Sequence, residues 1–160
     1  MSDTDTAAQQ GAAPDPALKV FDRFIGTWDM QGRTLDSNVP NMTARASYEW
    51  LPGGFFVLQR FQADFMGMEI DSFEVIGYDP ETGTFPSTVY SNMVGTPLSY
   101  RWEIDGDEVK ITTEELGATF RGEWSEDGAR LSGGWRPIPG REGPGNVPYD
   151  IWGGRARNER

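Results

Sequence analysis

The chain has 160 residues, a formal net charge of -11 from 25 acidic and 14 basic side chains, and neither cysteine nor histidine. The missing residue types exclude disulfides, thiolate metal sites, a Ser-His-Asp triad and a histidine-bound haem, and the charge makes nucleic acids and anionic membranes unfavourable partners. No apolar stretch has the form of a secretory signal or the length of a membrane span, so we expect a cytoplasmic protein.

The first segment of the chain is polar. Residues 1–16 are mainly Ala, Gln, Asp, Thr and Pro, with no large apolar side chain after Met1. Such a composition does not bury enough apolar surface to fold, so we predict a disordered tail. The rest of the chain has the length of one domain, which we place at residues 17–157.

A short helix is predicted directly after the tail, over residues 17–25. Leu18, Phe21, Phe24 and Ile25 follow the spacing of one helical face. Asp15 is a candidate N-cap ahead of this segment, because its carboxylate can accept hydrogen bonds from the first free backbone N–H groups.

From residue 27 onward, turn signals made of Gly, Pro, Asp and Asn alternate with runs rich in aromatic and β-branched residues. This rhythm predicts an all-β domain, an up-and-down meander of about ten antiparallel strands without a long helix. The predicted strands cover residues 27–36, 43–51, 55–65, 69–78, 84–93, 98–105, 108–115, 118–125, 130–138 and 149–157.

A meander of this size in one small domain must protect its edges, and closure into a barrel removes them. Side chains fill a barrel of up to about eight strands, so a larger one is expected to enclose a cavity. The content of 6 Trp, 9 Phe and 5 Tyr suits an apolar lining. The pattern therefore predicts a container.

Alternation along the strands predicts which faces are buried. Tyr100 and Trp102 share one face of their strand, and charged residues occupy the other. The third and fourth strands carry apolar residues on both faces, and we expect the helix to cover part of one of them.

The segment from residue 137 to 148 stands out because seven of its twelve residues are Pro or Gly. Such a composition predicts an extended surface segment without regular structure. It is either a long hairpin connection or a flap over the mouth of the barrel.

Three motifs resemble a known group of proteins: Gly26-Thr27-Trp28, Leu51–Phe56 and Val75–Gly83. A Gly-x-Trp that opens the first strand is similar to the signature of calycin barrels such as the lipocalins, and its Gly-Thr-Trp form is similar to nitrobindin-like barrels. Together the motifs most resemble a bacterial family of uncharacterised lipocalin-like proteins. The resemblance covers residues 18–157 and implies a calycin-like barrel whose function is not established.

The resemblance also implies two structural features. In calycins, an Arg or Lys on the last strand packs over the indole of the Gly-x-Trp motif, which here implies Arg155 or Arg157 over Trp28 as the closure of the barrel. Nitrobindin-like proteins bind haem through a histidine that this chain lacks, so we expect no haem and no other cofactor.

Arg60 is a candidate ligand-binding residue because it interrupts an apolar strand. If Arg60 points into the barrel, it can hold a ligand carboxylate or phosphate. If it points outward, a cross-strand ion pair with Glu74 is expected, and this second arrangement is favoured because exposed pairs of this kind are common.

Tyr90 and Asn92 lie two residues apart on one face of an unusually polar strand. Facing inward they would donate hydrogen bonds to an oxygenated ligand, and facing outward they would be ordinary surface. Trp50 and Trp102 complete the candidate lining as aromatic walls. Glu69 and Asp71 share a face without a third oxygen ligand at a recognisable spacing, so we expect no metal site.

Three functions remain open. The first is a protein that binds a small, largely apolar molecule through Arg60, Tyr90, Asn92, Trp50 and Trp102. The second is an enzyme that uses Glu74 or Tyr90 as acid or base, which a buried, strongly shifted pKa would favour. The third is a non-enzymatic interaction protein that forms a homodimer through its sheet.

Overall fold

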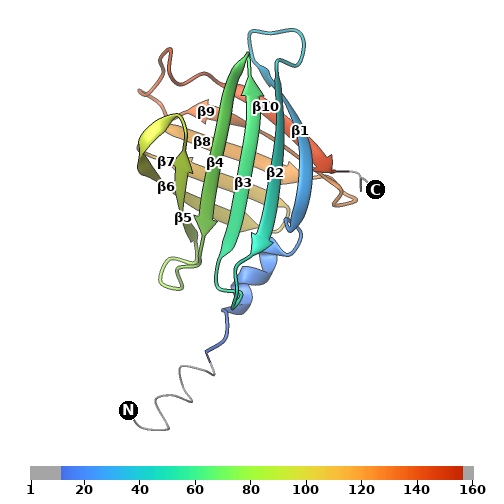
Figure 1. Cartoon of the computed structure of the whole chain (residues 1–160), viewed down its shortest axis with the longest axis vertical. Coiled ribbons are helices and arrows are strands. Elements are labelled where there is room, and N and C mark those ends of the chain that lie inside the picture. The colour runs from blue at the N-terminus through green and yellow to red at the C-terminus, as the bar shows by residue number, and fades with distance from the viewer. Residues whose placement is uncertain (1–11, 157–160) are drawn as a thin grey trace.

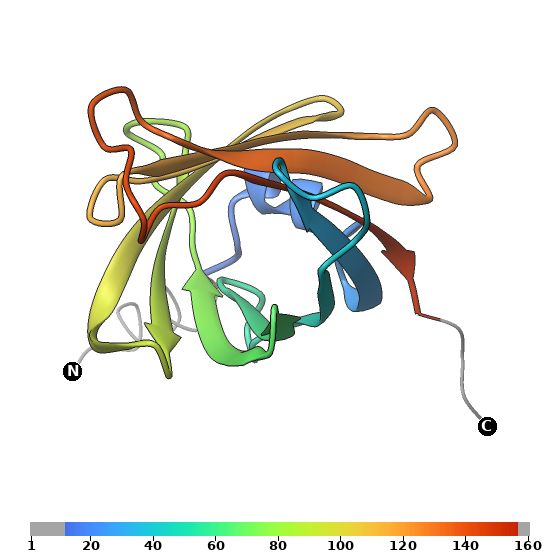
Figure 2. The same cartoon turned by 90° about the horizontal axis from the view of Figure 1, so that it is seen from above.

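The computed structural model describes residues 12–156. The predicted tail over residues 1–16 falls largely outside this range, as does Arg157. Within the range, all-β architecture is confirmed, and ten antiparallel strands close into one barrel in the order β1-β10-β9-β8-β7-β6-β5-β4-β3-β2 (Figures 1 and 2). The strands are β1 (Gly26–Thr34), β2 (Met42–Trp50), β3 (Val57–Phe65), β4 (Met68–Ile76), β5 (Phe85–Ser91), β6 (Val94–Asp105), β7 (Glu108–Thr113), β8 (Ala118–Trp124), β9 (Arg130–Pro137) and β10 (Tyr149–Arg155).

The predicted helix is shorter and tighter than its sequence pattern indicates. It is a single 3-10 helix, η1 (Pro16–Phe21), followed by a turn to Phe24. Asp15 is its N-cap, and the Asp15 carboxylate accepts a hydrogen bond from the backbone N–H of Ala17 at 2.9 Å. With only six residues, the helix gains its stability from its two buried apolar side chains, Leu18 and Phe21, rather than from its own hydrogen bonds.

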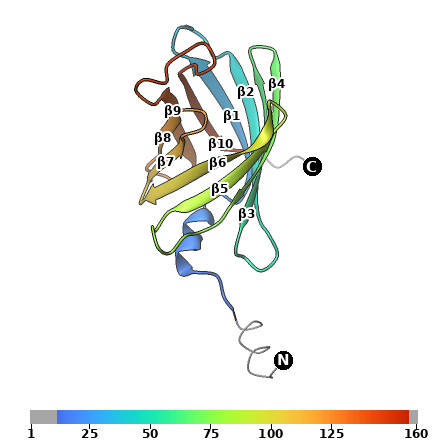
Figure 3. The same cartoon turned by 90° about the vertical axis from the view of Figure 1, so that its left-hand side faces the viewer.

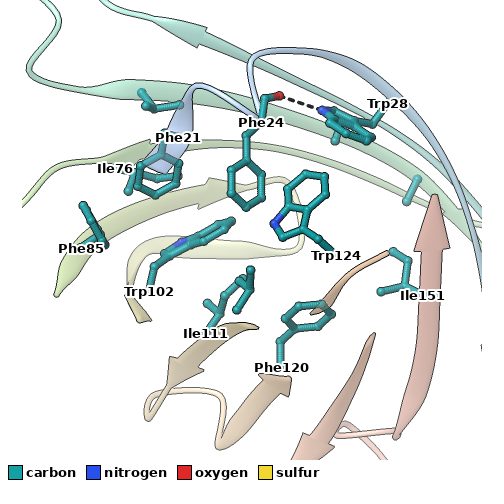
Figure 4. Packing of buried hydrophobic residues seen from close by; sticks show 14 of the residues in the cluster. Phe21, Phe24, Trp28, Ile76, Phe85, Trp102, Ile111, Phe120, Trp124 and Ile151 are labelled. Atoms are coloured by element: carbon teal, nitrogen blue, oxygen red, sulfur yellow. Dashed lines mark hydrogen bonds between the residues drawn. The ribbon is translucent and has the colours of Figure 1, made fainter. Parts of the chain in front are cut away.

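The helix was predicted to cover part of the third or fourth strand, and it does not lie along the outer face of either. The helix lies at one end of the barrel (Figures 1 and 3), and its apolar side chains enter the interior. Phe21 and Phe24 are 0% and 1% exposed, and their rings meet Trp102 at 5.6 and 5.7 Å. This end of the barrel, called the helix end below, is therefore closed by aromatic packing (Figure 4).

The barrel seam between β1 and β10 is secured beside this aromatic packing. The Trp28 indole donates a hydrogen bond to the Phe24 carbonyl at 2.7 Å, and the Arg155 guanidinium lies 4.7 Å from the Trp28 ring. Arg155 also donates hydrogen bonds to the carbonyls of Ile25 at 2.5 Å and Arg23 at 2.8 Å. The last strand is thus tied to the first strand and to the helix turn, in the contact that the resemblance implied.

We expect Arg155→Ala to lower the free energy of unfolding by about 1–3 kcal/mol, because it removes a cation–π contact and two charge-assisted hydrogen bonds. Urea unfolding measures the change. Arg121→Ala is the control, since Arg121 is exposed on the outer face of β8. Equal effects of the two substitutions would contradict a closing role for Arg155.

Candidate functional site

Six neighbouring strands contribute polar side chains to the inner face of the barrel. We call this set the polar belt; its members are Tyr48 (β2), Gln59 (β3), Glu74 (β4), Ser87 (β5), Tyr100 (β6) and Thr113 (β7). Strand register places them side by side, because Gln59 pairs with both Tyr48 and Glu74, and Ser87 pairs with Tyr100. Thr113 follows one step beyond the Arg101–Thr112 pair, which brings it opposite Tyr100.

Hydrogen bonds organise the first half of the belt. The Gln59 side-chain amide donates to the Tyr48 hydroxyl at 2.9 Å. One carboxylate oxygen of Glu74, Oε2, accepts two bonds, from the Ser87 hydroxyl at 2.6 Å and from the Trp102 indole at 2.7 Å. Glu74 is only 6% exposed, so a carboxyl group is held inside the barrel without a cation beside it.

The environment of Glu74 favours its neutral form. Burial raises the pKa of the Glu74 carboxyl above its ordinary value, and the hydrogen bonds from Ser87 and Trp102 offset only part of this shift. Burial also raises the pKa values of Tyr48, Tyr100 and Tyr149, with the Glu74 charge contributing at Tyr48 and Tyr100. Burial therefore favours the neutral forms of the titratable groups of the belt.

Several polar groups of the interior have unused hydrogen-bonding capacity. The Thr113 hydroxyl and the Trp124 indole N–H are buried, and neither has a partner within residues 12–156. In the same part of the chain, no hydrogen bond reaches the Tyr100 or Tyr149 hydroxyl, or the second oxygen of Glu74, Oε1. Buried groups of this kind are normally paired with protein, water or a ligand.

The end of the barrel opposite the helix is called the far end below. At the helix end, the inward residues Val57, Ile76 and Phe85 are at most 3% exposed. Toward the far end the exposure of the inward residues is mixed. Phe61, Phe65, Ile70, Tyr100, Trp135 and Tyr149 are half-buried, whereas Thr34, Met42 and Thr113 are at most 3% exposed. Part of the aromatic inner wall therefore retains accessible surface.

The loops around the far end carry exposed apolar side chains. Because the strands are antiparallel, this end collects the connections β1–β2, β3–β4, β5–β6, β7–β8 and β9–β10. Each connection, or the first residue after it, carries at least one large exposed apolar residue: Leu35, Val39, Met66, Met68, Met93, Leu116 and Val147. An apolar rim thus surrounds the far end of the barrel.

The glycine- and proline-rich segment after residue 137 is the β9–β10 connection of this rim. Arg141 donates hydrogen bonds to the carbonyls of Glu114 and Glu115 at 2.8 and 3.1 Å, and Asn146 donates to the Gly117 carbonyl at 2.9 Å. These hydrogen bonds hold the segment against the β7–β8 turn. The segment is therefore a hairpin connection that packs against a neighbouring turn.

Arg60 points away from the interior. It is exposed on the outer face of β3, where it pairs with Asp71 at 3.2 Å and lies 5.1 Å from the Phe73 ring. The expected Arg60–Glu74 ion pair is wrong, because Glu74 faces inward on the neighbouring strand. Along a strand alternate residues face opposite sides, and Arg60 is in register with Phe73 rather than with Glu74.

Tyr90 and Asn92 also lie outside. Tyr90 is 52% exposed, because its neighbour Val89 takes the inward position on β5. Asn92 belongs to the β5–β6 turn, where its side chain accepts a hydrogen bond from the Asp71 backbone and donates one to the Glu69 carbonyl. The inward alternative is therefore wrong for both residues.

The two predicted tryptophans do belong to the interior. Trp102 is 2% exposed and bonds directly to Glu74, whereas Trp50 is half-buried at the end of β2 and packs against the core. The belt residues Gln59, Ser87 and Thr113 were not predicted. The only sign of these residues in the sequence is a polar side chain at a position where the alternation of the strand would place an apolar one. This sign can be used only when it is known which face of the strand points inward.

The outer wall has hollows of its own. A broad groove crosses β6 to β10, and Arg33, Lys110 and Arg136 are among its lining residues. These cations are neutralised in place, because Arg136 and Arg33 pair with Asp150 at 2.7 and 3.8 Å and Lys110 pairs with Glu103 at 3.7 Å. Arg121, which also lines the groove, belongs to none of these ion pairs.

Within residues 12–156, no three acidic side chains converge closely enough to hold a metal ion. No helix in the same range has the length and apolar character needed to span a membrane.

Comparisons with known proteins agree with this architecture. Residues 13–131 match the model of a family described as "Protein of unknown function (DUF1579)". The crystal structure of Rv2717c from M. tuberculosis is similar, with a TM-score of 0.57 and 14% sequence identity over 90% of this chain and 99% of that chain. At this identity the likeness concerns the fold alone. None of the curated proteins matches the chain.

Proposed function

The chain belongs to the DUF1579 family of proteins of unknown function, and we propose that it binds a small, largely apolar molecule inside its barrel, against the polar belt. The observation that carries this proposal is the belt itself, in which polar groups with unused hydrogen-bonding capacity lie on the inner face of the barrel beside half-buried aromatic residues. A binding site that is mostly apolar with a few placed polar groups is the usual form of a small-molecule site. The proposed mode of binding, with the ligand inside the barrel, resembles that of the lipocalins.

The proposed binding residues differ from the sequence prediction. Trp102 remains in the set, and the belt replaces Arg60, Tyr90 and Asn92. Trp50 contributes apolar contact area at the helix end. The apolar rim supports the same proposal, because it places apolar surface around the route by which an apolar molecule would enter.

The neutral probe N-phenyl-1-naphthylamine tests this function by its fluorescence on binding. We expect Ala44→Trp, which fills an inward, half-buried position near the far end, to weaken binding at least about tenfold, because overfilling removes the space that the probe needs. Thr43→Trp, at the neighbouring outward position, is the matched control. Urea unfolding verifies that both variants fold.

A second inward position provides an independent test in case Ala44→Trp does not fold. Ser91→Trp fills the other side of the interior, and Tyr90→Trp is its outward control. Probe binding that is equal in the inward and outward variants would overturn the proposal. Native mass spectrometry of gently purified protein complements this test, since a stoichiometric adduct that is lost on unfolding identifies the bound molecule.

An acid/base enzyme is the second candidate, favoured by the burial that raises the Glu74 pKa. Tyr90 has no part in it, because Tyr90 is exposed. The same adduct separates the two functions: a binding protein releases its molecule chemically unchanged, whereas an enzyme incubated with it yields a product that Glu74→Gln does not form.

A further inference from the structure

We propose that the polar belt selects an uncharged ligand whose carbonyl oxygen accepts a hydrogen bond from the Glu74 carboxyl, and that it rejects carboxylates of the same shape. This inference rests on the proposed function, since it names the chemical class of the bound molecule. It follows from three features of the interior.

The first feature is the distribution of charge. Along the ten described strands, Glu74 and Arg155 are the only Asp, Glu, Lys or Arg residues at inward positions of the alternation. Arg155 is engaged at the helix end by the Trp28 ring and by the carbonyls of Ile25 and Arg23. The belt therefore has no cation that could offset a ligand anion, and burying an unpaired anion beside Glu74 is strongly unfavourable.

The second feature is the way in which Glu74 is bonded. Its Oε2 atom accepts the hydrogen bonds from Ser87 and Trp102. In the neutral carboxyl the proton then resides on Oε1, which has no hydrogen-bond partner within residues 12–156. A protonated carboxyl has one O–H donor, so Oε1 supplies a free donor to a ligand oxygen.

The groups that face Glu74 leave this donor intact. Tyr48 on β2 and Tyr100 on β6 are the titratable neighbours, and burial raises the pKa of each hydroxyl. Gln59 on β3 and the Ser87 and Trp102 side chains are uncharged, as are Phe21 and Leu18 of η1. None of these side chains carries a positive charge that would favour the ionised form of Glu74.

The third feature is an excess of unused donors. The Trp124 indole N–H can only donate, and it is unpartnered in the described chain together with the Thr113 hydroxyl. The Tyr100 hydroxyl is also without a hydrogen-bond partner there. A ligand that carries acceptor oxygens on an apolar body complements these groups, because each of them can donate a hydrogen bond.

Size-matched pairs of ketone and carboxylate test the inference. The pairs are acetophenone with benzoate, and 2-acetylnaphthalene with 2-naphthoate, titrated calorimetrically into the full chain at about pH 7. We expect at least one ketone to bind at least about 30-fold more tightly than its carboxylate, because an unpaired buried charge costs several kcal/mol. Tyr100→Phe and Thr113→Val should weaken ketone binding about 3- to 10-fold, with Tyr90→Phe and Thr112→Val as outward controls.

The pH dependence of ketone binding provides a readout specific to Glu74. Binding by the native chain should weaken as the pH rises through the raised pKa of Glu74, since the donor is then lost. Glu74→Gln retains an N–H donor and should bind the ketone with little change over the same range, whereas Glu69→Gln on the outer face should behave like the native chain.

Each failure has a distinct signature. If a carboxylate binds as tightly as its ketone, or no ketone binds while N-phenyl-1-naphthylamine still enters the barrel, the proposed ligand class is overturned and the binding function stands. If the fluorescent probe also fails to enter, the proposed function fails and this inference with it.

Discussion

Phe24→Ala should produce the largest loss of stability among single substitutions in this protein, about 3–5 kcal/mol in the free energy of unfolding. The Phe24 side chain is 1% exposed and its ring contacts those of Phe21, Tyr48, Trp102 and Trp124 at centroid distances between 5.0 and 5.7 Å. Removing the ring leaves a cavity at the helix end, whose rigid aromatic neighbours cannot collapse to fill it.

Urea unfolding at constant pH measures this effect, with Val20→Ala as the control. Val20 belongs to the same segment but is 36% exposed, so its truncation should cost less than about 1 kcal/mol. A loss of less than about 1 kcal/mol in Phe24→Ala would show that the segment does not close the barrel.

Glu74→Gln should remove a large part of the pH dependence of stability. The folded-state pKa of Glu74 is raised above its ordinary value of 4.5 by burial, so the folded chain holds this proton more tightly than the unfolded chain does. The contribution of Glu74 to stability is therefore fully present below about pH 4.5 and is lost as the pH rises through the folded-state pKa, by about 1.4 kcal/mol for each unit of difference.

Unfolding free energies measured from acid to mildly alkaline pH test this expectation. The native chain should lose stability relative to Glu74→Gln as the pH rises, whereas Glu69→Gln, on the exposed face of the same strand, should follow the native curve. The Trp102 indole N–H resonance provides a direct probe, because this group donates to Glu74. Parallel curves for the native chain and Glu74→Gln, or a Trp102 resonance that shifts near pH 4.5, would contradict a raised Glu74 pKa.

Formation of a homodimer remains a prediction, and the fold limits the surfaces through which two copies would associate. Edge-to-edge pairing of sheets needs a free strand edge, which the closed barrel lacks. An association of two copies would instead use an outer face, such as the exposed Phe73 and Tyr90 pair on β4 and β5. Sedimentation of the full chain tests it, and Tyr90→Ser should lower any dimer fraction.

The amino-acid sequence determined much of the architecture by itself. Turn residues at short intervals and runs of β-branched and aromatic residues correctly predict ten strands, with most bounds within two residues. Strict alternation in the second half correctly places Tyr100 and Trp102 on the buried face. These features are local, because turn chemistry and the two-residue period of a strand depend only on neighbouring residues.

Only the tertiary structure decided which side chains of the first strands point into the barrel, and hence which residues form the candidate site. Arg60 and Glu74 lie on strands with apolar residues on both faces, where alternation alone gives no direction, and a one-residue difference in register exchanges inside and outside. The polar belt depends on six strands being aligned across the barrel, with Gln59 between Tyr48 and Glu74. Such alignment is set by barrel closure and by the aromatic packing of Phe21 and Phe24, which are contacts between residues far apart in the chain.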